Sequence, residues 1–469
     1  MRHLILFVTM LVCSLQLSAQ ADRKMANEIA TQINSGIPER LFELFDSTFK
    51  TQFPLAEVKN AVPSLQNAFG KFEGVEKLKE RNGEYLYKLN GSKSAINMLF
   101  RFNTGGLAML LFTNDDPLFD IKKRHAWFTD NTLQTNTDRV VDSVVKSVLV
   151  RSNTAGLSIG VIQNGRQTIY NYGETAWGSG RMPRSASVYE IGSISKTFTG
   201  TVVAHFIRTG KINPDDAVNK YLPDSIRPVM WNNEPLLVRH IIGHAAGMPH
   251  ENMKQDGAPV SDDPDNRMKY FGSKHLLAML NDWQPFEQPG QKFRYSNYGY
   301  SLLGYICERI SGQTISQLFQ EIIFKPLGMK NTALIGEKPF GDMVPSMIDG
   351  KQVKNTPVIA YAPAGGIQST ISDMLRYAAI QLNPGESETG RDVSASHEPS
   401  VQTEMKMATG WFYDTNEKGK FFFHSGGTSG FTSRMIFQPV TQTAVVVLSN
   451  CRNGDTNEIG DIIFQKLNR

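Results

Sequence analysis

The spacing of the apolar residues changes near residue 70, and this change restricts the fold of the N-terminal part of the chain. Upstream, residues such as Leu41, Phe42 and Phe45 recur at helical spacing. The pattern predicts helices at residues 25–33, 39–49 and 55–69. Downstream, Asn-Gly pairs and a glycine-rich turn separate four expected strands, at residues 75–80, 85–89, 95–102 and 107–112. Helices followed by hairpins indicate a small α+β domain, which we place at residues 22–114.

A second domain is expected from residue 135 to residue 469, after a polar linker at 115–134 that includes Lys122-Lys123-Arg124. Its first hairpin is predicted at 156–163 and 167–173, around Asn164-Gly165. Later strands would complete the same antiparallel sheet: one ending near 423, one at 431–437 and one at 444–448. Helical and loop segments lie between them, so a helical lobe beside the sheet would leave a site in the cleft.

The first 21 residues have the pattern of a secretory signal peptide. Arg2-His3 precedes the apolar run from Leu4 to Leu17, and Ala19-Gln20-Ala21 matches an Ala-x-Ala cleavage site. The mature chain would begin near Asp22 and reside in the periplasm or outside the cell. Cys13 follows Val12, where lipid attachment requires a small residue, so a lipoprotein anchor is not expected.

Composition limits the classes of partner. The chain has 469 residues, 40% of them apolar and 20% charged, which suits a globular protein with more than one core. Removing the signal peptide takes away only Arg2 among the charged residues, so the net charge falls from +4 to +3. This charge does not favour nucleic acid, and no second stretch is long enough to span a bilayer. We expect a small-molecule or short-peptide substrate and no cofactor.

Ser193 and Lys196 form a candidate nucleophile and base. They lie three residues apart at the start of an apolar run, so a helix would place both side chains on one face. A neighbouring lysine can take the serine proton, and a helix start favours negative charge on the reacting oxygen. Ser47 and Lys50, and Ser143 and Lys146, have the same spacing. The spacing alone therefore does not identify the site.

Tyr295 and Asn297 are candidate partners of this pair. They are two residues apart in a polar and aromatic stretch after Pro289-Gly290, which is typical of a loop leading into a helix at 301–309. On such a loop both side chains can face one cavity. A phenol whose pKa is lowered by Lys196 could pass protons, and an amide could hold the lysine or a substrate carbonyl. A half-buried structural tyrosine is the alternative.

His424-Ser425-Gly426-Gly427 ends an aromatic run and is predicted to form a strand end in the late meander. Its glycines would let a ligand backbone lie close to the strand edge. The alternative for His424 is a strand-end histidine whose ring is satisfied by the backbone.

Together these segments resemble the serine β-lactamase and penicillin-binding-protein superfamily, specifically its class C-like branch. That branch includes class C β-lactamases, D-Ala-D-Ala carboxypeptidases and family VIII-type carboxylesterases. The resemblance rests on the segments at residues 189–200, 239–249, 295–297, 362–370 and 424–426. It implies a β-lactamase/transpeptidase-like fold with an antiparallel sheet and a helical lobe. The preceding small α+β domain resembles the nuclear-transport-factor-like cone.

The resemblance also implies roles. Ser193 would be the acylated nucleophile, Lys196 and Tyr295 the proton-transfer pair, and Asn297 a positioning amide. His424, Ser425 and Gly426 would contact the substrate, and the N–H groups of Ser193 and Gly427 would form the oxyanion hole.

One departure bears on the substrate: class C β-lactamases usually carry Lys-Thr-Gly where this chain has His-Ser-Gly. A fixed positive charge is then missing near neutral pH. We therefore expect a hydrolase of D-amino-acid peptides or small esters and amides. A β-lactamase and a non-catalytic receptor for penicillin or cell-wall peptides are the alternatives.

Two other kinds of site are considered and rejected. His240 and His244 have the four-residue spacing of some zinc sites, but no glutamate follows His240 in the protease pattern, so no metal is expected. The glycines at 426–430 lack the lysine and spacing of a phosphate loop. We predict no disulfide between Cys307 and Cys451, because either cysteine can be a buried apolar residue.

Overall fold

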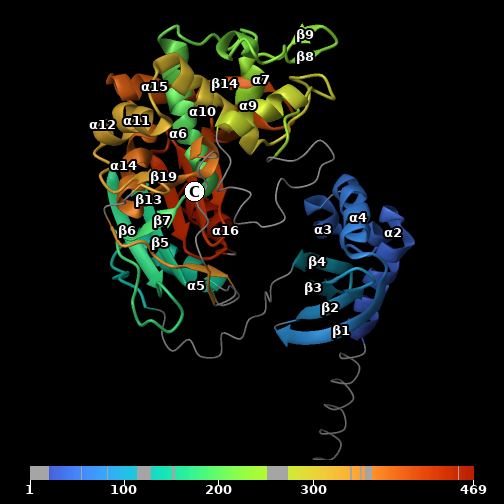
Figure 1. Cartoon of the computed structure of the whole chain (residues 1–469). Coiled ribbons are helices and arrows are strands. Elements are labelled where there is room, and N and C mark those ends of the chain that lie inside the picture. The colour runs from blue at the N-terminus through green and yellow to red at the C-terminus, as the bar shows by residue number, and fades with distance from the viewer. Residues whose placement is uncertain are drawn as a thin grey trace, which may run out of the picture. The chain divides into compact units, whose positions relative to one another are not determined.

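A computed structural model describes most of the chain (Figure 1). The described residues are 21–53, 55–81, 83–113, 128–149, 154–250, 273–337, 341–348, 351–353, 362–452 and 454–468. The predicted signal peptide up to residue 20, Cys13 within it and Lys122-Lys123-Arg124 of the predicted linker lie outside these ranges. Contacts divide the chain into two compact units, Met1–Lys123 and Arg124–Arg469.

The first unit contains helices followed by a four-stranded antiparallel meander. Its helices are a segment at 21–35, α2 (Pro38–Glu43), α3 (Ser47–Gln52) and α4 (Leu55–Phe69). Its strands are β1 (Phe72–Arg81), β2 (Glu84–Gly91), β3 (Ala95–Asn103) and β4 (Gly106–Thr113), paired in that order. The four predicted strands are therefore confirmed. Val58 and Val62 of α4 pack in one core with Tyr87 and Phe100 of the sheet.

The prediction of a single helix at 39–49 is wrong, because the structure contains two short helices there. Asp46 caps the start of α3 by accepting a hydrogen bond from the Phe49 N–H at 2.7 Å. The N–H of Asp46 donates to the Leu107 carbonyl of β4 at 2.8 Å, and Phe45 bridges to Leu107. Pairing with a distant strand thus interrupts a segment whose apolar spacing suits a continuous helix.

The second unit is built on an eight-stranded sheet in the order β14-β15-β16-β17-β18-β19-β5-β6. The strands are β5 (Gly156–Gln163), β6 (Arg166–Gly173), β14 (Pro399–Gln402), β15 (Lys406–Ala408), β16 (Phe412–Asn416), β17 (Gly419–Gly427), β18 (Thr432–Gln438) and β19 (Thr443–Ser449). All the pairings are antiparallel, and β19 pairs with β5. The early hairpin and the late meander therefore share one sheet, as predicted.

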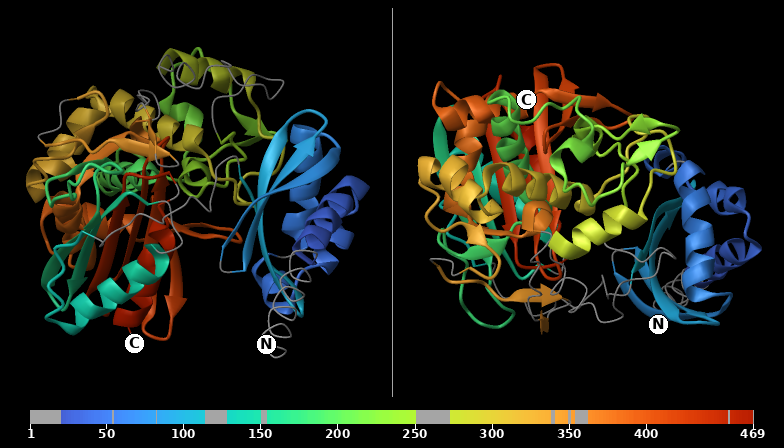
Figure 2. Two further views of the ribbon diagram at one scale, coloured as in Figure 1. Left: turned by 90° about the horizontal axis from the view of Figure 1, so that it is seen from below. Right: turned by 45° about the horizontal axis from the view of Figure 1, so that its top comes forward.

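Both faces of this sheet are covered. Val445 and Val447 of β19 pack in one core with α5 (Asn136–Leu149) and α16 (Thr456–Leu467), which Figure 2 shows together on one face. Val446 and Leu448 belong to the core on the other face, which includes α6 (Ser195–Arg208) and α14 (Ile371–Leu382). Side chains alternate between faces along a strand, so a run of apolar residues serves two cores.

Shorter elements complete the second unit. The helices are α7 (Val238–Ile242), α9 (Ser273–Asp282), α10 (Asn297–Ser311), α11 (Ile315–Phe319), α12 (Lys325–Leu327), α13 (Ala362–Gly365) and α15 (Glu388–Ser396), with 3-10 turns at Gly192–Ile194 and Val218–Tyr221 and a π-helical turn at Gln320–Phe324. The strands are β7 (Val188–Glu190), β8 (Met230–Trp231), β9 (Glu234–Pro235), β10 (Ala333–Leu334), β11 (Ser346–Ile348), β12 (Lys351–Val353) and β13 (Ile367–Thr370). Strands β10, β13 and β7 form a small sheet beside the nucleophile segment. Among the helices in the described ranges, none has the length and apolar character needed to cross a bilayer.

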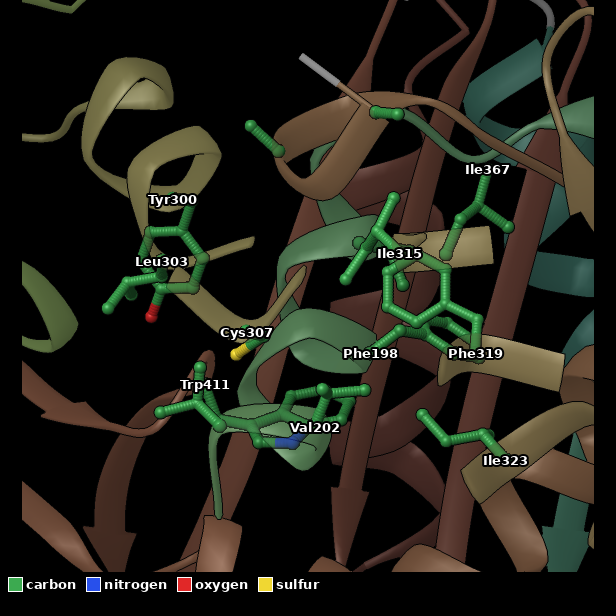
Figure 3. Close-up of a cluster of buried hydrophobic side chains, with 14 of the residues drawn as sticks. Phe198, Val202, Tyr300, Leu303, Cys307, Ile315, Phe319, Ile323, Ile367 and Trp411 are labelled. Carbon is green, nitrogen blue, oxygen red and sulfur yellow. The ribbon is translucent and has the colours of Figure 1, made fainter. Parts of the chain in front are cut away.

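The core of the helical lobe is centred on α6 (Figure 3). The Phe198 ring stacks on Tyr377 with centroids 3.9 Å apart and meets the edge of Phe324 at 5.8 Å. Cys307 is buried in the same core with a free thiol, and Cys451 is buried in a separate cluster. Burial of α6 fixes the position of Ser193, which lies just before its first residue.

We expect Phe198→Ala to destabilise the second unit strongly, because it removes the ring at the centre of this core. Truncating a buried phenylalanine typically lowers the free energy of unfolding by about 3–5 kcal/mol. Phe286→Ala is the matched control, since that ring is 62% exposed, and we expect a change within about 0.5 kcal/mol. Urea unfolding followed by tryptophan fluorescence measures this, because all 5 tryptophans lie in the second unit. Equal effects of the two substitutions would contradict the packing described.

Candidate active site

Ser193 lies in the tight turn that joins β7 to α6. Gly192 has a φ of +51°, and a Cβ atom there would lie 2.6 Å from the backbone nitrogen of Gly427. Glycine is needed at this position because of both its backbone conformation and this close approach. One turn of helix later, the Lys196 Nζ lies 3.1 Å from the Ser193 Oγ. The predicted contact between nucleophile and base is present.

The other two Ser-x-x-Lys pairs have different surroundings. Lys146 is 47% exposed and binds Asp142 at 2.8 Å, on the exposed side of α5. The Lys50 Nζ lies 5.5 Å from the ring centroid of Phe42. Lys196 is instead fully buried. Burial distinguishes the Ser193 pair from its two sequence counterparts.

Contacts of the Lys196 amine with described residues come from three segments, the nearest of them in sequence being that of Ser193. The amine donates to the Asn297 Oδ1 of α10 and to the Ala364 carbonyl of α13, each at 2.6 Å. A lysine amine that gives two N–H groups to carbonyl oxygens has its third tetrahedral position left for Ser193. That position holds a third N–H in the ammonium form and a lone pair in the amine form. The arrangement therefore directs the third position of the Lys196 amine at the Ser193 Oγ.

The prediction that Asn297 lies on a loop is wrong. It is the first residue of α10. Ser296 is the N-cap, and its hydroxyl accepts a hydrogen bond from the Gly299 N–H at 2.9 Å. The capping serine lets the helix begin four residues before the predicted start. Tyr295 precedes the cap, so the two side chains leave from a loop and from a helix start. They nevertheless meet at Lys196, whose Nζ lies 4.8 Å from the Tyr295 ring centroid.

The prediction that the pKa of Tyr295 is lowered is wrong. We expected Lys196 to lower the pKa of the phenol, but burial raises this pKa well above its ordinary value, and a hydrogen bond with Ser193 opposes that change only in part. Removing a side chain from water disfavours its charged form. Tyr295 is therefore a neutral phenol at neutral pH, with a proton to donate.

His424 is a neutral imidazole of fixed tautomer. Its Nδ1 lies 2.7 Å from the Ser425 carbonyl, so Nδ1 carries the hydrogen and donates it. Its Nε2 is buried and has no hydrogen-bond partner among the described residues. Burial and then the charge of Lys196 lower the pKa of His424 to about 3. The backbone thus satisfies one ring nitrogen only, and the other keeps a bare lone pair close to Tyr295.

The other residues at this end of β17 face different directions. The Ser425 Oγ accepts a hydrogen bond from the Arg434 Nη1 at 3.0 Å, and Arg434 pairs with Asp461 of α16, so this hydroxyl faces away from the helical lobe. A Cβ at Gly426 would lie 1.9 Å from the Ile191 carbonyl oxygen, whereas a Cβ at Gly427 would meet nothing within 4 Å. Gly426 therefore accommodates the nucleophile turn, and only Gly427 adjoins open space.

His244 contributes to this site in a way the sequence analysis missed. Its ring packs on Tyr295 at 4.5 Å and on Tyr300 at 4.8 Å, and its Nδ1 accepts the Ser296 N–H at 3.1 Å. It has a left-handed backbone, with φ +54°, which is uncommon outside glycine. From the sequence, the four-residue spacing of His240 and His244 is weighed only as a zinc pair, which gives no sign of this packing role. In the described parts of the chain, no three His, Cys, Asp or Glu side chains could hold a metal ion together.

Comparisons with known proteins find a matching family, similar sequences and a similar structure. The family described as Beta-lactamase matches residues 138–467. A "Beta-lactamase" of Pseudomonas fluorescens is 28% identical over 59% of this chain and 74% of its own length. "Protein flp" of Staphylococcus aureus (strain MW2) is 26% identical over 68% of this chain, which spans 64% of that relative. The crystal structure of a beta-lactamase/D-alanine carboxypeptidase from Pseudomonas syringae superposes with a TM-score of 0.61 at 22% identity, covering 71% of this chain and 99% of the other.

The protonation of His424 makes the stability of the second unit depend on pH. With a folded pKa of about 3 and an ordinary value of about 6.5, the unfolded chain binds more protons between these limits. Stability therefore falls as the pH decreases from 6.5 towards 3. We expect His424→Asn to reduce the slope of unfolding free energy against pH by about 1.4 kcal/mol per pH unit in this window. Urea unfolding at several pH values measures this, and equal slopes would contradict a neutral His424.

Proposed function

The chain belongs to the beta-lactamase family, and we propose that it is a serine hydrolase of that superfamily whose acyl-enzyme forms on Ser193. The observation that carries this proposal is the 3.1 Å contact between the Ser193 Oγ and a buried Lys196 Nζ. Two carbonyl groups hold the other N–H groups of that lysine. Chance Ser-x-x-Lys pairs elsewhere in the chain lack this setting.

The proposed proton transfer is supported by the contacts of Ser193 with Lys196, at 3.1 Å, and with Tyr295. Lys196, as the amine, accepts the proton of the Ser193 hydroxyl while the serine oxygen attacks the substrate carbonyl. Tyr295 is a neutral phenol, so it gives its proton to the leaving group and regains one from Lys196. Water then cleaves the acyl-enzyme through the reverse sequence. In this proposal Lys196 is the base and Tyr295 the proton carrier.

The oxyanion would be stabilised by the N–H groups of Ser193 and Gly427. The two backbones lie close together, since a Cβ atom at Gly192, next to Ser193, would lie 2.6 Å from the Gly427 nitrogen. Gly427 also adjoins open space, which leaves room for a substrate carbonyl. Preorganised donors of this kind supply a large part of the rate in acyl transfer.

We propose D-amino-acid peptides, or small esters and amides, as substrates. His424 supports this choice because it is neutral in the position where lysine-bearing relatives have a cation. A β-lactamase is the second candidate, favoured by the name of the relative from Pseudomonas fluorescens. We further propose that the chain is exported and cleaved before Asp22, on the strength of the N-terminal sequence pattern alone.

Ser193→Ala tests the reaction. We expect it to lower kcat for an activated short-chain aryl ester by at least about 10³-fold, because it removes the nucleophile. Ser143→Ala is the matched control, since it alters the exposed Ser-x-x-Lys pair of α5 and should keep full activity. Equal background rates in the wild type and Ser193→Ala would contradict catalysis. Retained binding of penicillin or of a D-Ala-D-Ala peptide would then favour a receptor.

His424→Lys tests the substrate class. A cation at this position would attract a substrate carboxylate through a charge-assisted hydrogen bond, which contributes about 1.5–3 kcal/mol. We expect the ratio of kcat/KM for a peptide ending in a free D-alanine carboxylate to that of its C-terminal amide to rise roughly tenfold or more. An unchanged ratio would show that another group sets this preference.

A further inference from the structure

His244 contacts the segment that carries Tyr295 through both its backbone and its side chain. The His244 carbonyl accepts the Arg294 N–H at 2.6 Å. The Nδ1 of its ring accepts the Ser296 N–H at 3.1 Å. Arg294 and Ser296 are the chain neighbours of Tyr295. One residue therefore ties the backbone on both sides of this phenol.

The His244 ring also contacts the phenol ring itself. The two ring centroids lie 4.5 Å apart, and the imidazole lies 4.8 Å from the ring of Tyr300. Tyr300 is anchored in turn, because its hydroxyl donates to the Ile242 carbonyl at 2.9 Å. His244 is 1% exposed. Side chains packed this densely have little freedom to move, so the imidazole restricts the orientation of the phenol ring.

These contacts are made from an unusual backbone conformation. His244 lies just after the end of α7, and its φ is +54°. Residues other than glycine rarely adopt this left-handed conformation. They keep it where surrounding contacts compensate for the strain, and such residues are concentrated at active sites. The hydrogen bonds to Arg294 and Ser296 are contacts of this kind.

The ring of His244 has a position to hold and no proton to exchange. Its Nδ1 accepts a backbone N–H, so the hydrogen of the neutral ring is on Nε2. Burial lowers the pKa of His244 well below its ordinary value, which keeps the ring neutral at neutral pH. Nε2 is buried and has no hydrogen-bond partner among the described residues. The polar contact of this ring with the described residues is therefore the one to Ser296.

Other hydrogen bonds hold the start of α10 independently of His244. The Ser296 Oγ donates to the Pro249 carbonyl at 2.6 Å, and the Asn297 N–H donates to the His250 carbonyl at 2.9 Å. A substitution at His244 should therefore leave Asn297 in place. Its effect should be on Tyr295, which precedes the cap of the helix.

We propose that His244 is a positioning residue that fixes the Tyr295 phenol beside Lys196 and the leaving group. This inference rests on the proposed function, because Tyr295 carries a proton only within that mechanism. There the phenol gives its proton to the leaving oxygen or nitrogen while the bond to the acyl carbon breaks, and the phenolate regains a proton from Lys196. His244 exchanges no proton in these steps.

Leaving groups of different basicity reveal this role. An alkyl ester releases an alkoxide, a strong base that needs the proton of Tyr295, whereas an activated aryl ester releases a stable phenolate that does not. Two esters with the same acyl group share the nucleophile, the base and the oxyanion donors. The alkyl-to-aryl ratio of kcat/KM, which reports acylation, therefore isolates the proton carrier. A general disturbance of the site would lower both values alike.

Two substitutions that both suit the left-handed backbone test the proposal. Glycine adopts a positive φ without strain, so His244→Gly removes the ring and the acceptor alone. We expect kcat/KM to fall by roughly 10- to 100-fold for the alkyl ester, because a displacement of about 1 Å can cost about 10²-fold. For the aryl ester it should stay within about threefold. Asparagine also tolerates this conformation, and its Oδ1 can accept the Ser296 N–H. His244→Asn should therefore be roughly tenfold faster than His244→Gly on the alkyl ester.

Tyr295→Phe checks that both residues act on the same proton. Removing the phenol O–H should lower the alkyl-to-aryl ratio in the same direction as His244→Gly. Adding His244→Gly to Tyr295→Phe should have no further effect, because the group that His244 positions is already absent. A further loss in the double variant on the alkyl ester, as large as that of His244→Gly by itself, contradicts the proposal.

His397→Ala is the matched control for deleting a histidine with similar contacts. Its ring stacks on Phe422 with centroids 4.5 Å apart, and its Nε2 lies 2.7 Å from the Gln381 Oε1. We expect this variant to be less stable and to keep the ratio of the wild type. Tryptophan fluorescence confirms that each variant is folded before its kinetics are compared. An unchanged ratio in His244→Gly, or equal losses on the two esters, overturns the inference.

An NMR measurement separates failure of this inference from failure of the proposed function. With nitrogen-labelled histidine, the ring signal that disappears in His244→Asn should show a hydrogen on Nε2 and a bare Nδ1 at neutral pH, whether or not the chain hydrolyses an ester. A hydrogen on Nδ1 overturns the inference even when hydrolysis is normal, because Nδ1 could not then accept the Ser296 N–H. If Nδ1 is bare but the wild type hydrolyses neither ester, the proposed function fails, and the positioning role fails with it.

Discussion

The candidate site depends on one buried amine. Lys196 is fully enclosed, and its hydrogen bonds join the nucleophile turn to α10 through Asn297 and to α13 through Ala364. A buried amino group has to be satisfied by acceptors of good geometry, so these elements are fixed relative to one another wherever the lysine is accommodated. Packing of Phe198 two residues further along α6 fixes the helix that carries it. The chemistry and the core of the lobe are thus built on the same helix.

A second constraint is the contact between the nucleophile turn and the end of β17. Glycine at 192 and at 426 lets the two backbones approach to a distance that any side chain would prevent. The Ser433 hydroxyl then connects the same two segments by donating to the Ile191 carbonyl. Such close contacts are rigid, because interiors are packed as densely as molecular crystals. This rigidity is what the proposed oxyanion hole, made of two N–H groups from distant segments, would require.

Burial, more than neighbouring charge, sets the protonation of the site. It keeps Tyr295 a phenol and His424 a neutral imidazole. The nearby Lys196 would favour ionisation of a phenol in water, but desolvation of the phenol is the larger effect here. Both groups are therefore neutral, and they offer the site a hydrogen-bond donor and a lone pair in place of fixed charges.

The sequence by itself determined the local geometry. Three-residue spacing placed Ser193 and Lys196 on one face, Asn-Gly pairs marked hairpins, and the order of the motifs indicated the family. Only the tertiary structure decided which Ser-x-x-Lys pair is buried, because the partners of Lys196 lie 101 and 168 residues away. It also decided that 39–49 breaks into two helices, that Asn297 begins a helix and that Tyr295 stays neutral. Spacing along a chain encodes the periodicity of a helix or strand, whereas desolvation and contacts between distant segments arise only when those elements pack.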